Sequence, residues 1–150
     1  MADTITKEKR SKNMAAIRSK DTKPEVYIRK LLFSRGFRYR KNSKKVFGHP
    51  DIYMTKYNLA VFVNGCFWHR HKDCRFAYMP KSRIEFWEKK FLDNINRDIR
   101  VRNQLEADSV RCLIIWECTI KHMMREPSYA EQQIDVIIGF INSSDSYMEI

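Results

Sequence analysis

Residues 59–74 read LAVFVNGCFWHRHKDC. The first five are apolar and include two β-branched valines, which is typical of a buried strand. After Gly65, two cysteines, two histidines and two large aromatic residues fall within nine positions. A core strand that runs directly into a loop of metal ligands predicts a functional site at one end of a sheet.

The rest of the chain predicts an α/β fold. A hydroxyl residue followed three positions later by Glu, the capping-box pattern, predicts helix starts at Thr22, Ser82 and Ser128. Gly36 is expected to end the first of these helices in a left-handed conformation. Short apolar segments between the helices read as strands, which gives a mixed sheet flanked by helices. The expected helices are 7–19, 23–35, 82–107 and 128–142, and the expected strands are 37–39, 51–54, 59–63 and 110–116.

The positive charge lies in the first third of the chain. Residues 1–45 contain 15 Lys/Arg and 4 Asp/Glu, whereas residues 46–150 contain 14 of each. Clusters of basic residues at 7–12 and 38–45 can lie along a phosphate backbone and release counterions. Nucleic acid is therefore the expected partner, with a solvated basic surface as the alternative.

Length and composition predict a single domain over residues 1–150, with a basic helical DNA-binding segment at about 1–20. The chain has 150 residues, of which 43% are hydrophobic. It contains no apolar run of about 18 residues and no signal-peptide pattern. We therefore expect a cytoplasmic monomer that does not contact a membrane.

Three of the four cysteines fit a metal site better than disulfides, because thiols stay reduced in the cytoplasm. Cys66, His71 and Cys74 have the spacing of a short loop around one ion, and a later cysteine can complete a tetrahedral Cys₃His zinc site. Cys112 lies within a predicted strand, whereas Cys118 follows its end. Cys118 is the expected fourth ligand, with a buried thiol as its alternative role. With four protein ligands, the zinc would be structural.

A second metal site is predicted where two strand ends converge. The Asp51 carboxylate and a backbone carbonyl at the end of the next strand, near 63–65, could hold Mg²⁺, which keeps its other positions for water and phosphate oxygens. His69 would then act as general base toward a water molecule. Glu25 could orient that water or His69, although a capping-box glutamate already has a structural role.

At these residues the chain resembles the very short patch repair DNA mismatch endonucleases, the Vsr family. The resemblance covers about the first 120 residues. It implies a restriction-endonuclease-like fold and a Mg²⁺-dependent enzyme that nicks one strand 5′ to the thymine of a T·G mismatch, which begins the repair of deaminated 5-methylcytosine. The matching segments are 10–14, Asp21-Thr22, Pro50-Asp51, 65–69, 85–87 and 115–118.

The resemblance also implies roles for individual residues and partners. Asp51 and the Val63 carbonyl would carry the catalytic metal, His69 would be the general base, and Glu25 would support it. Double-stranded DNA would be the substrate, with a link to other mismatch-repair proteins and a cytosine-5 methyltransferase, in a bacterial cytoplasm and on the nucleoid when bound. The implied zinc ligands are Cys66, His71, Cys74 and Cys118, and the implied DNA contacts are Phe67, Trp68, Trp87, Met14, Arg10 and Lys12.

Three features depart from the expected patterns. Phe62-Val63-Asn64 lacks the acidic residue and the lysine that nucleases of this fold often carry after the second strand. Val63 stands where the family often has threonine, and Asn64 where it often has histidine. Two residues separate His71 from Cys74, one more than the family pattern.

Alternative functions remain for the same features. One is a zinc-stabilised DNA-binding module without cleavage activity, and another is a related endonuclease that cuts both strands of an intact recognition sequence. Trp87, with Ile84 and Phe91 at helical spacing, fits core packing as well as a wedge between bases.

Overall fold

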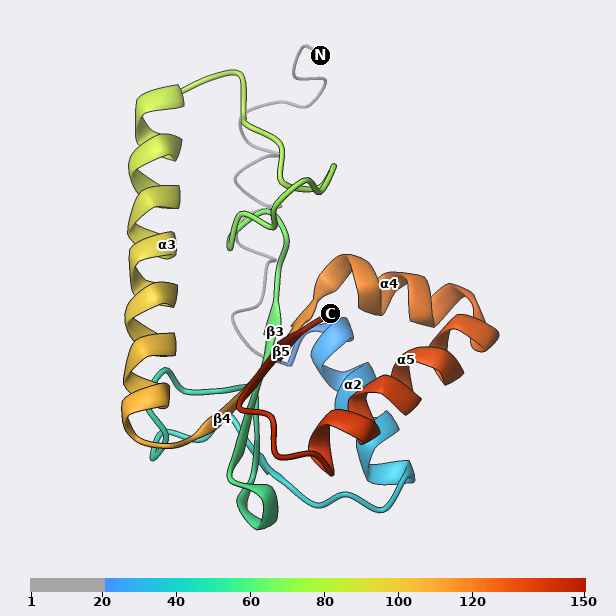
Figure 1. Ribbon diagram of the computed structural model, residues 1–150. Coiled ribbons are helices and arrows are strands. Elements are labelled where there is room, and N and C mark those ends of the chain that lie inside the picture. The colour runs from blue at the N-terminus through green and yellow to red at the C-terminus, as the bar shows by residue number, and fades with distance from the viewer. Residues whose placement is uncertain (1–20) are drawn as a thin grey trace.

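The protein forms a five-stranded mixed sheet with helices on both faces (Figure 1). The structure is a computed structural model that describes residues 21–150. The expected helix at 7–19 and the predicted DNA contacts Arg10, Lys12 and Met14 lie outside these residues. In chain order the elements are α2 (Lys23–Ser34), β1 (Arg40–Lys41), β2 (Ile52–Met54), a short 3₁₀ helix (Thr55–Tyr57), β3 (Leu59–Asn64), α3 (Ile84–Ala107), β4 (Arg111–Trp116), α4 (Glu117–Arg125), α5 (Pro127–Ile141) and β5 (Tyr147–Glu149).

The strands lie in the order in which they occur in the chain. β1, β2 and β3 are antiparallel neighbours, and β3, β4 and β5 are parallel neighbours. Val61 pairs with Leu113 in the central parallel ladder. α3 makes the crossover that a parallel connection requires. The predicted α/β class, with a mixed sheet flanked by helices, is confirmed.

Successive side chains of the central strands point to opposite faces of the sheet, so the core lies on both faces. Val61, Leu113 and Ile115 are fully buried and pack in one cluster with residues of α2, α4 and α5. Ala60 and Cys112 face the other side and pack with Leu105 of α3. In Figure 1, α3 stands on the opposite side of the sheet from α2, α4 and α5, and its first half extends beyond the strands.

The start and end of α2 follow the sequence signals. The Thr22 side chain accepts a hydrogen bond from the backbone N–H of Glu25 at 3.4 Å. Gly36 has a φ of +90°, and its N–H bonds to the Phe33 carbonyl. The Phe37 N–H bonds to the Leu32 carbonyl, which completes a Schellman motif.

The other two capping boxes are not used. α3 begins at Ile84 after Arg83, which has a φ of +55° and separates Ser82 from the helix. α5 begins one residue earlier than predicted, at Pro127, whose fixed φ suits the first turn of a helix. Ser128 therefore lies inside the helix and caps nothing.

Three strand and helix assignments also differ from the prediction. The strand expected at 37–39 lies at Arg40–Lys41, because only these residues pair with Tyr53 and Ile52. Helix α4 and strand β5 were not predicted. No described helix is long and apolar enough to cross a membrane.

Candidate active site and metal cluster

The end of β3 and the residue before β2 meet at one edge of the sheet. Antiparallel pairing places Ile52 opposite Val61, so the chain on either side of these residues also runs close together. The Val63 backbone N–H donates to Asp51 Oδ2 at 2.7 Å. The predicted convergence of the two strand ends is present, while the metal-binding role of the Val63 carbonyl stays a prediction.

Asp51 sits in an environment that favours its neutral form. Burial raises the pKa of Asp51 to about 6, against the lowering effect of the Val63 N–H bond. The charge of Glu25 raises this pKa further, while those of Arg29 and His69 lower it. Glu25, Arg29 and His69 therefore all lie within electrostatic range of Asp51. A bound cation would favour the ionised carboxylate.

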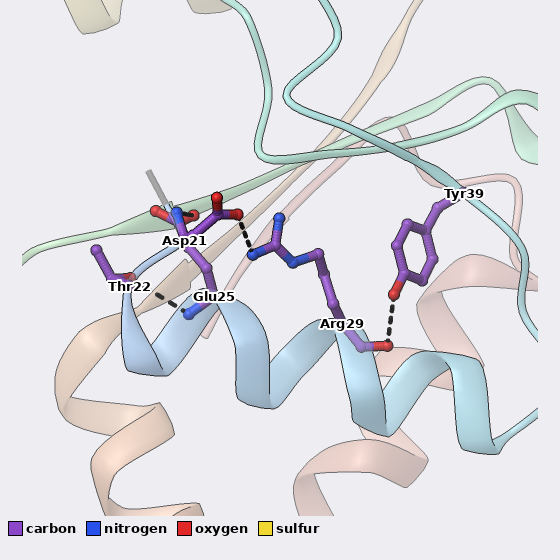
Figure 2. A network of polar contacts seen from close by, with 5 residues as sticks. All are labelled: Asp21, Thr22, Glu25, Arg29 and Tyr39. Atoms are coloured by element: carbon purple, nitrogen blue, oxygen red, sulfur yellow. Dashed lines mark hydrogen bonds and ion pairs between the residues drawn. The ribbon is translucent and has the colours of Figure 1, made fainter. Parts of the chain in front are cut away.

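Glu25 has the structural role that its capping box predicts, in an altered form. Its side chain is buried, and Oε2 accepts a hydrogen bond from the Asp21 N–H at 2.8 Å (Figure 2). In the usual capping box this acceptor bonds to the N-cap residue, which here is Thr22. The Glu25 carboxylate thus accepts the bond at the start of α2 and also lies within electrostatic range of Asp51. A catalytic role for Glu25 stays a prediction.

His69 is oriented by a carboxylate that the sequence did not reveal. Its Nδ1 lies 2.7 Å from Asp98 Oδ2, on the face of α3 that packs against the loop after β3. Asn94, one turn earlier on α3, donates to the Trp68 carbonyl at 3.1 Å. A bond from Nδ1–H to Asp98 leaves Nε2 free to accept a proton. In the sequence, the helical spacing of Phe91, Asn94 and Asp98 is the one pattern that places Asp98 on this face of α3.

Four predicted ligands form one cluster. The side-chain donor atoms of Cys66, His71, Cys74 and Cys118 all lie within 4.8 Å of one another. His71 Nδ1 is 3.5 Å from the sulfur atoms of both Cys66 and Cys118. Three thiols and one imidazole are a donor set that suits zinc. The geometry fits a single tetrahedral ion.

Of the two later cysteines, the structure places Cys118 in this cluster. Cys112 is buried in β4 on the α3 side of the sheet, away from the cluster, whereas Cys118 lies in the first turn of α4. The extra residue between His71 and Cys74 is absorbed by a turn in which the Cys74 N–H approaches the His71 carbonyl at 3.4 Å. Asp73 takes a φ of +56° in this turn.

Residues of β4 and β5 support the ligand His71, and burial affects the ligand Cys66. Burial raises the pKa of the Cys66 thiol to about 12. The His71 ring stacks on Trp116, with ring centres 4.0 Å apart and planes 7° from parallel. Trp116 Nε1 in turn donates to Glu149 Oε1 of β5 at 3.3 Å. The end of the chain thus supports a ligand of the metal cluster.

The three predicted wedge residues form one aromatic group. The Phe67 ring centre lies 5.2 Å from that of Trp68 and 5.4 Å from that of Trp87, and the two tryptophans are 5.8 Å apart. All three side chains are half-buried. Phe91 packs beneath Phe67 and is 4% exposed, whereas Ile84 is 47% exposed. The group is therefore packed against Phe91 and remains partly exposed to solvent.

A groove of about 1140 Å³ opens beside His69 and Asp98, between α3 and the sheet. One wall is the loop that carries Lys44 and Lys45, and the other is the part of α3 that carries Arg97, Arg100 and Arg102. Exposed basic side chains therefore approach the candidate active site from two elements.

A mixed sheet with an acidic and imidazole site at its edge, and a cysteine–histidine cluster beside it, defines a restriction-endonuclease-like protein. Comparison with known proteins identifies the family. Residues 2–75 match the DNA mismatch endonuclease Vsr family. The type II nicking enzyme V.NmeAIP of Neisseria meningitidis serogroup A is 47% identical over 122 residues, which cover 81% of this chain and 86% of that protein.

Two further relatives are similar over most of the chain. The type II nicking enzyme V.XorIIP of Xanthomonas oryzae pv. oryzae is 40% identical over 82% of this chain and 90% of its own length. The DNA mismatch endonuclease Vsr of Escherichia coli K12 is 39% identical over 81% of this chain and 77% of its own length. The chain belongs to the Vsr family of DNA mismatch endonucleases.

Proposed function

We propose that this protein is a Mg²⁺-dependent endonuclease that nicks one DNA strand 5′ to the thymine of a T·G mismatch. Such a nick would begin the very short patch repair of deaminated 5-methylcytosine. The family supports the nicking activity, since relatives carry the names of nicking enzymes and of a mismatch endonuclease. The observation that carries the proposal is that the Asp51 carboxylate lies within electrostatic range of His69, whose ring is paired with Asp98.

Each residue of the site has a defined role in this proposal. The carboxylate of Asp51 and the carbonyl of Val63 would hold Mg²⁺, whose charge would stabilise negative charge on the phosphate. His69 accepts a proton from the attacking water at Nε2. Asp98 holds the imidazole in the required tautomer and stabilises its protonated form. Glu25 orients the water.

The Cys₃His cluster would hold zinc in a structural role. His69 lies between Cys66 and His71 in the sequence, so ligands on both sides fix the loop that presents it. Cys118 connects this loop to the first turn of α4. A closed site with four protein ligands leaves no open position for a substrate. The cluster therefore serves catalysis by positioning His69.

Recognition of the mismatch is assigned to the aromatic group. Phe67, Trp68 and Trp87 would insert beside the mismatched pair, where opening the stack costs less than at a paired site. Met14 would reach the opposite groove, and Arg10 and Lys12 would contact phosphates. The partly exposed surface of the aromatic group supports this role.

The setting of the reaction follows from the same proposal. The protein would act as a monomer on double-stranded DNA in a bacterial cytoplasm, associated with the nucleoid when bound. Its link to other mismatch-repair proteins and to a cytosine-5 methyltransferase would be functional, since methylation creates the base whose deamination gives T·G.

The proposed catalytic roles are tested by separating cleavage from binding. Asp51→Ala and His69→Ala should abolish nicking of a T·G duplex while its dissociation constant changes little, because neither residue belongs to the aromatic group. Full nicking activity in either purified variant would remove that residue from the mechanism. If the unmodified protein binds the mismatch but never nicks it, the chain is a DNA-binding module without cleavage activity.

A further inference from the structure

Arg29 carries a buried charge that the fold does not fully satisfy. The residue is only 5% exposed, and its Nη2 donates to Asp21 Oδ1 at 2.7 Å. Its Nη1 is buried without a hydrogen-bond partner in the described part of the chain. Figure 2 shows one terminal nitrogen directed to Asp21 and the other pointing away from it. Because an unsatisfied buried N–H group is costly, stability alone gives no reason for arginine here.

The Arg29–Asp21 pair acts on the backbone that holds Glu25. Asp21 has a φ of +56°, a left-handed conformation that is uncommon for residues other than glycine. In this conformation its N–H points at Glu25 Oε2 and donates to it at 2.8 Å. The guanidinium therefore restrains the residue whose amide orients the Glu25 carboxylate.

One further contact holds the backbone of Arg29 in place. The Tyr39 hydroxyl donates to the Arg29 carbonyl at 3.0 Å, from the segment that follows α2. Glu25 is one helical turn before Arg29, so both side chains project from the same face of α2. Both also lie within electrostatic range of Asp51, on which their charges act in opposite directions.

We propose that Arg29 is a positioning residue of the active site. It holds Asp21 in the conformation that aims its amide at Glu25, and it supplies a fixed positive charge beside the Glu25 carboxylate. Arg29 touches neither DNA nor the reacting atoms in this scheme. The inference rests on the proposed nicking function and adds to it a residue that acts through Glu25.

A double-mutant cycle tests this proposal. Single-turnover nicking of a T·G duplex would be measured at saturating protein and Mg²⁺ for Arg29→Met, Glu25→Gln and the double variant. Arg29→Met should lower the rate by about 10- to 100-fold without changing the dissociation constant for the duplex. In the Glu25→Gln background the same change should cause almost no further loss, because residues that act as a unit are not additive. Arg29→Lys should recover part of the rate, since it keeps the charge.

A matched control and a second variant complete the experiment. Lys30→Met changes an exposed neighbour on α2 and should nick at the unmodified rate. If Arg29→Met does not fold, as judged by its thermal melting, Asp21→Asn takes its place in the cycle. Asp21 is more exposed, with 45% of its side-chain surface accessible, and the same lack of additivity is expected.

The outcomes separate this inference from the proposed function. If Arg29→Met or its replacement lowers the rate by the same factor in both backgrounds, or does not lower it, the positioning role is overturned while nicking stands. If Glu25→Gln nicks at the full rate, the role of Arg29 through Glu25 is overturned as well. If the unmodified protein fails to nick, the proposed function itself is wrong and this inference falls with it.

Discussion

At the scale of single residues, the orientation of His69 depends on a carboxylate from a distant part of the chain. Asp98 is 29 positions further along and approaches Nδ1 at 2.7 Å across the gap between the loop and α3. A neutral amide at this position could favour the wrong tautomer and could not stabilise a protonated ring. The pair is therefore a more specific sign of function than either residue alone.

The role of Asp98 gives a first prediction. Asp98→Asn should lower the single-turnover nicking rate by about 10-fold or more, while mismatch binding is retained. The matched control is Asp93→Asn, which changes an exposed aspartate on the same helix. Unchanged nicking in Asp98→Asn would show that the contact has no part in catalysis.

The environment of Asp51 gives a second prediction, on pH and stability. Its pKa is about 6 in the folded protein and 3.8 as a reference value, so the folded state holds a proton that the unfolded chain releases between these values. The free energy of unfolding therefore falls as pH rises through this range. At pH 8, without Mg²⁺, Asp51→Asn should raise the free energy of unfolding by up to about 3 kcal/mol.

Urea denaturation at pH 8 and pH 4 checks this second prediction. The gain in Asp51→Asn should be largest at pH 8 and nearly absent at pH 4, where the native carboxylic acid is already neutral. The same gain at both pH values would mean that ionisation of Asp51 is not the cause.

Some residues of the site can be recognised from the sequence, and others cannot. Asp51, His69 and the cluster ligands stand beside turns and strand ends, where their chemistry is easily seen. Asp98 lies in the middle of a 24-residue helix rich in charged residues, so its partner is set only by the packing of α3. Arg29 is hidden for the same reason, since nothing in its helix indicates that it is buried.

At the scale of elements, the loop between β3 and α3 carries three of the four residues of the cysteine–histidine cluster. Elemental analysis should find one zinc per chain. Cys118→Ser should lower both the zinc content and the melting temperature, and should reduce nicking because His69 loses its support. Cys112→Ala is the control, since this thiol lies outside the cluster and should leave the zinc content at one. Absence of zinc from the unmodified protein would contradict the assignment.

Helix α5 gives a fourth prediction. Ile134 is fully buried against the sheet, whereas Val136 on the same helix is 45% exposed. Ile134→Ala should destabilise the protein by about 2–5 kcal/mol, because it leaves a cavity in the core. Val136→Ala should cost less than about 0.5 kcal/mol. Equal losses in chemical denaturation would show that α5 does not pack on the sheet in this register.

The elements that sequence reasoning found and missed differ in their local signals. Helix α5 has apolar residues at helical spacing, and strands β3 and β4 are nearly continuous apolar runs, so the sequence predicts all three. Helix α4 follows β4 without a side-chain cap, and the Trp116–Glu117 junction carries no turn residue. Strand β5 has only three residues and pairs through its backbone, as in the bond from the Ile150 N–H to the Ile114 carbonyl. Tertiary contacts define both elements.

At the scale of the whole molecule, the protein has an excess of positive charge, and DNA is a polyanion. The formal net charge is +11 at pH 7, and it arises from residues 1–45. Affinity for DNA should fall steeply with salt, with a slope in log–log form of about 0.9 for each phosphate contact. Replacing both Arg10 and Lys12 by alanine should reduce the slope by about two, whereas Arg125→Ala, at the end of α4, should leave it unchanged. An unchanged slope in the double variant would exclude these phosphate contacts.

We expect one strand to be cut only where thymine opposes guanine. This expectation is tested most directly with two duplexes that differ in a single T·G or C·G pair, each labelled on both strands, in Mg²⁺ or in EDTA. We predict a nick confined to the thymine strand, on its 5′ side, that requires both the mismatch and Mg²⁺. Cleavage of the C·G duplex, of both strands, or in EDTA would contradict the proposed function, as would the absence of any cut.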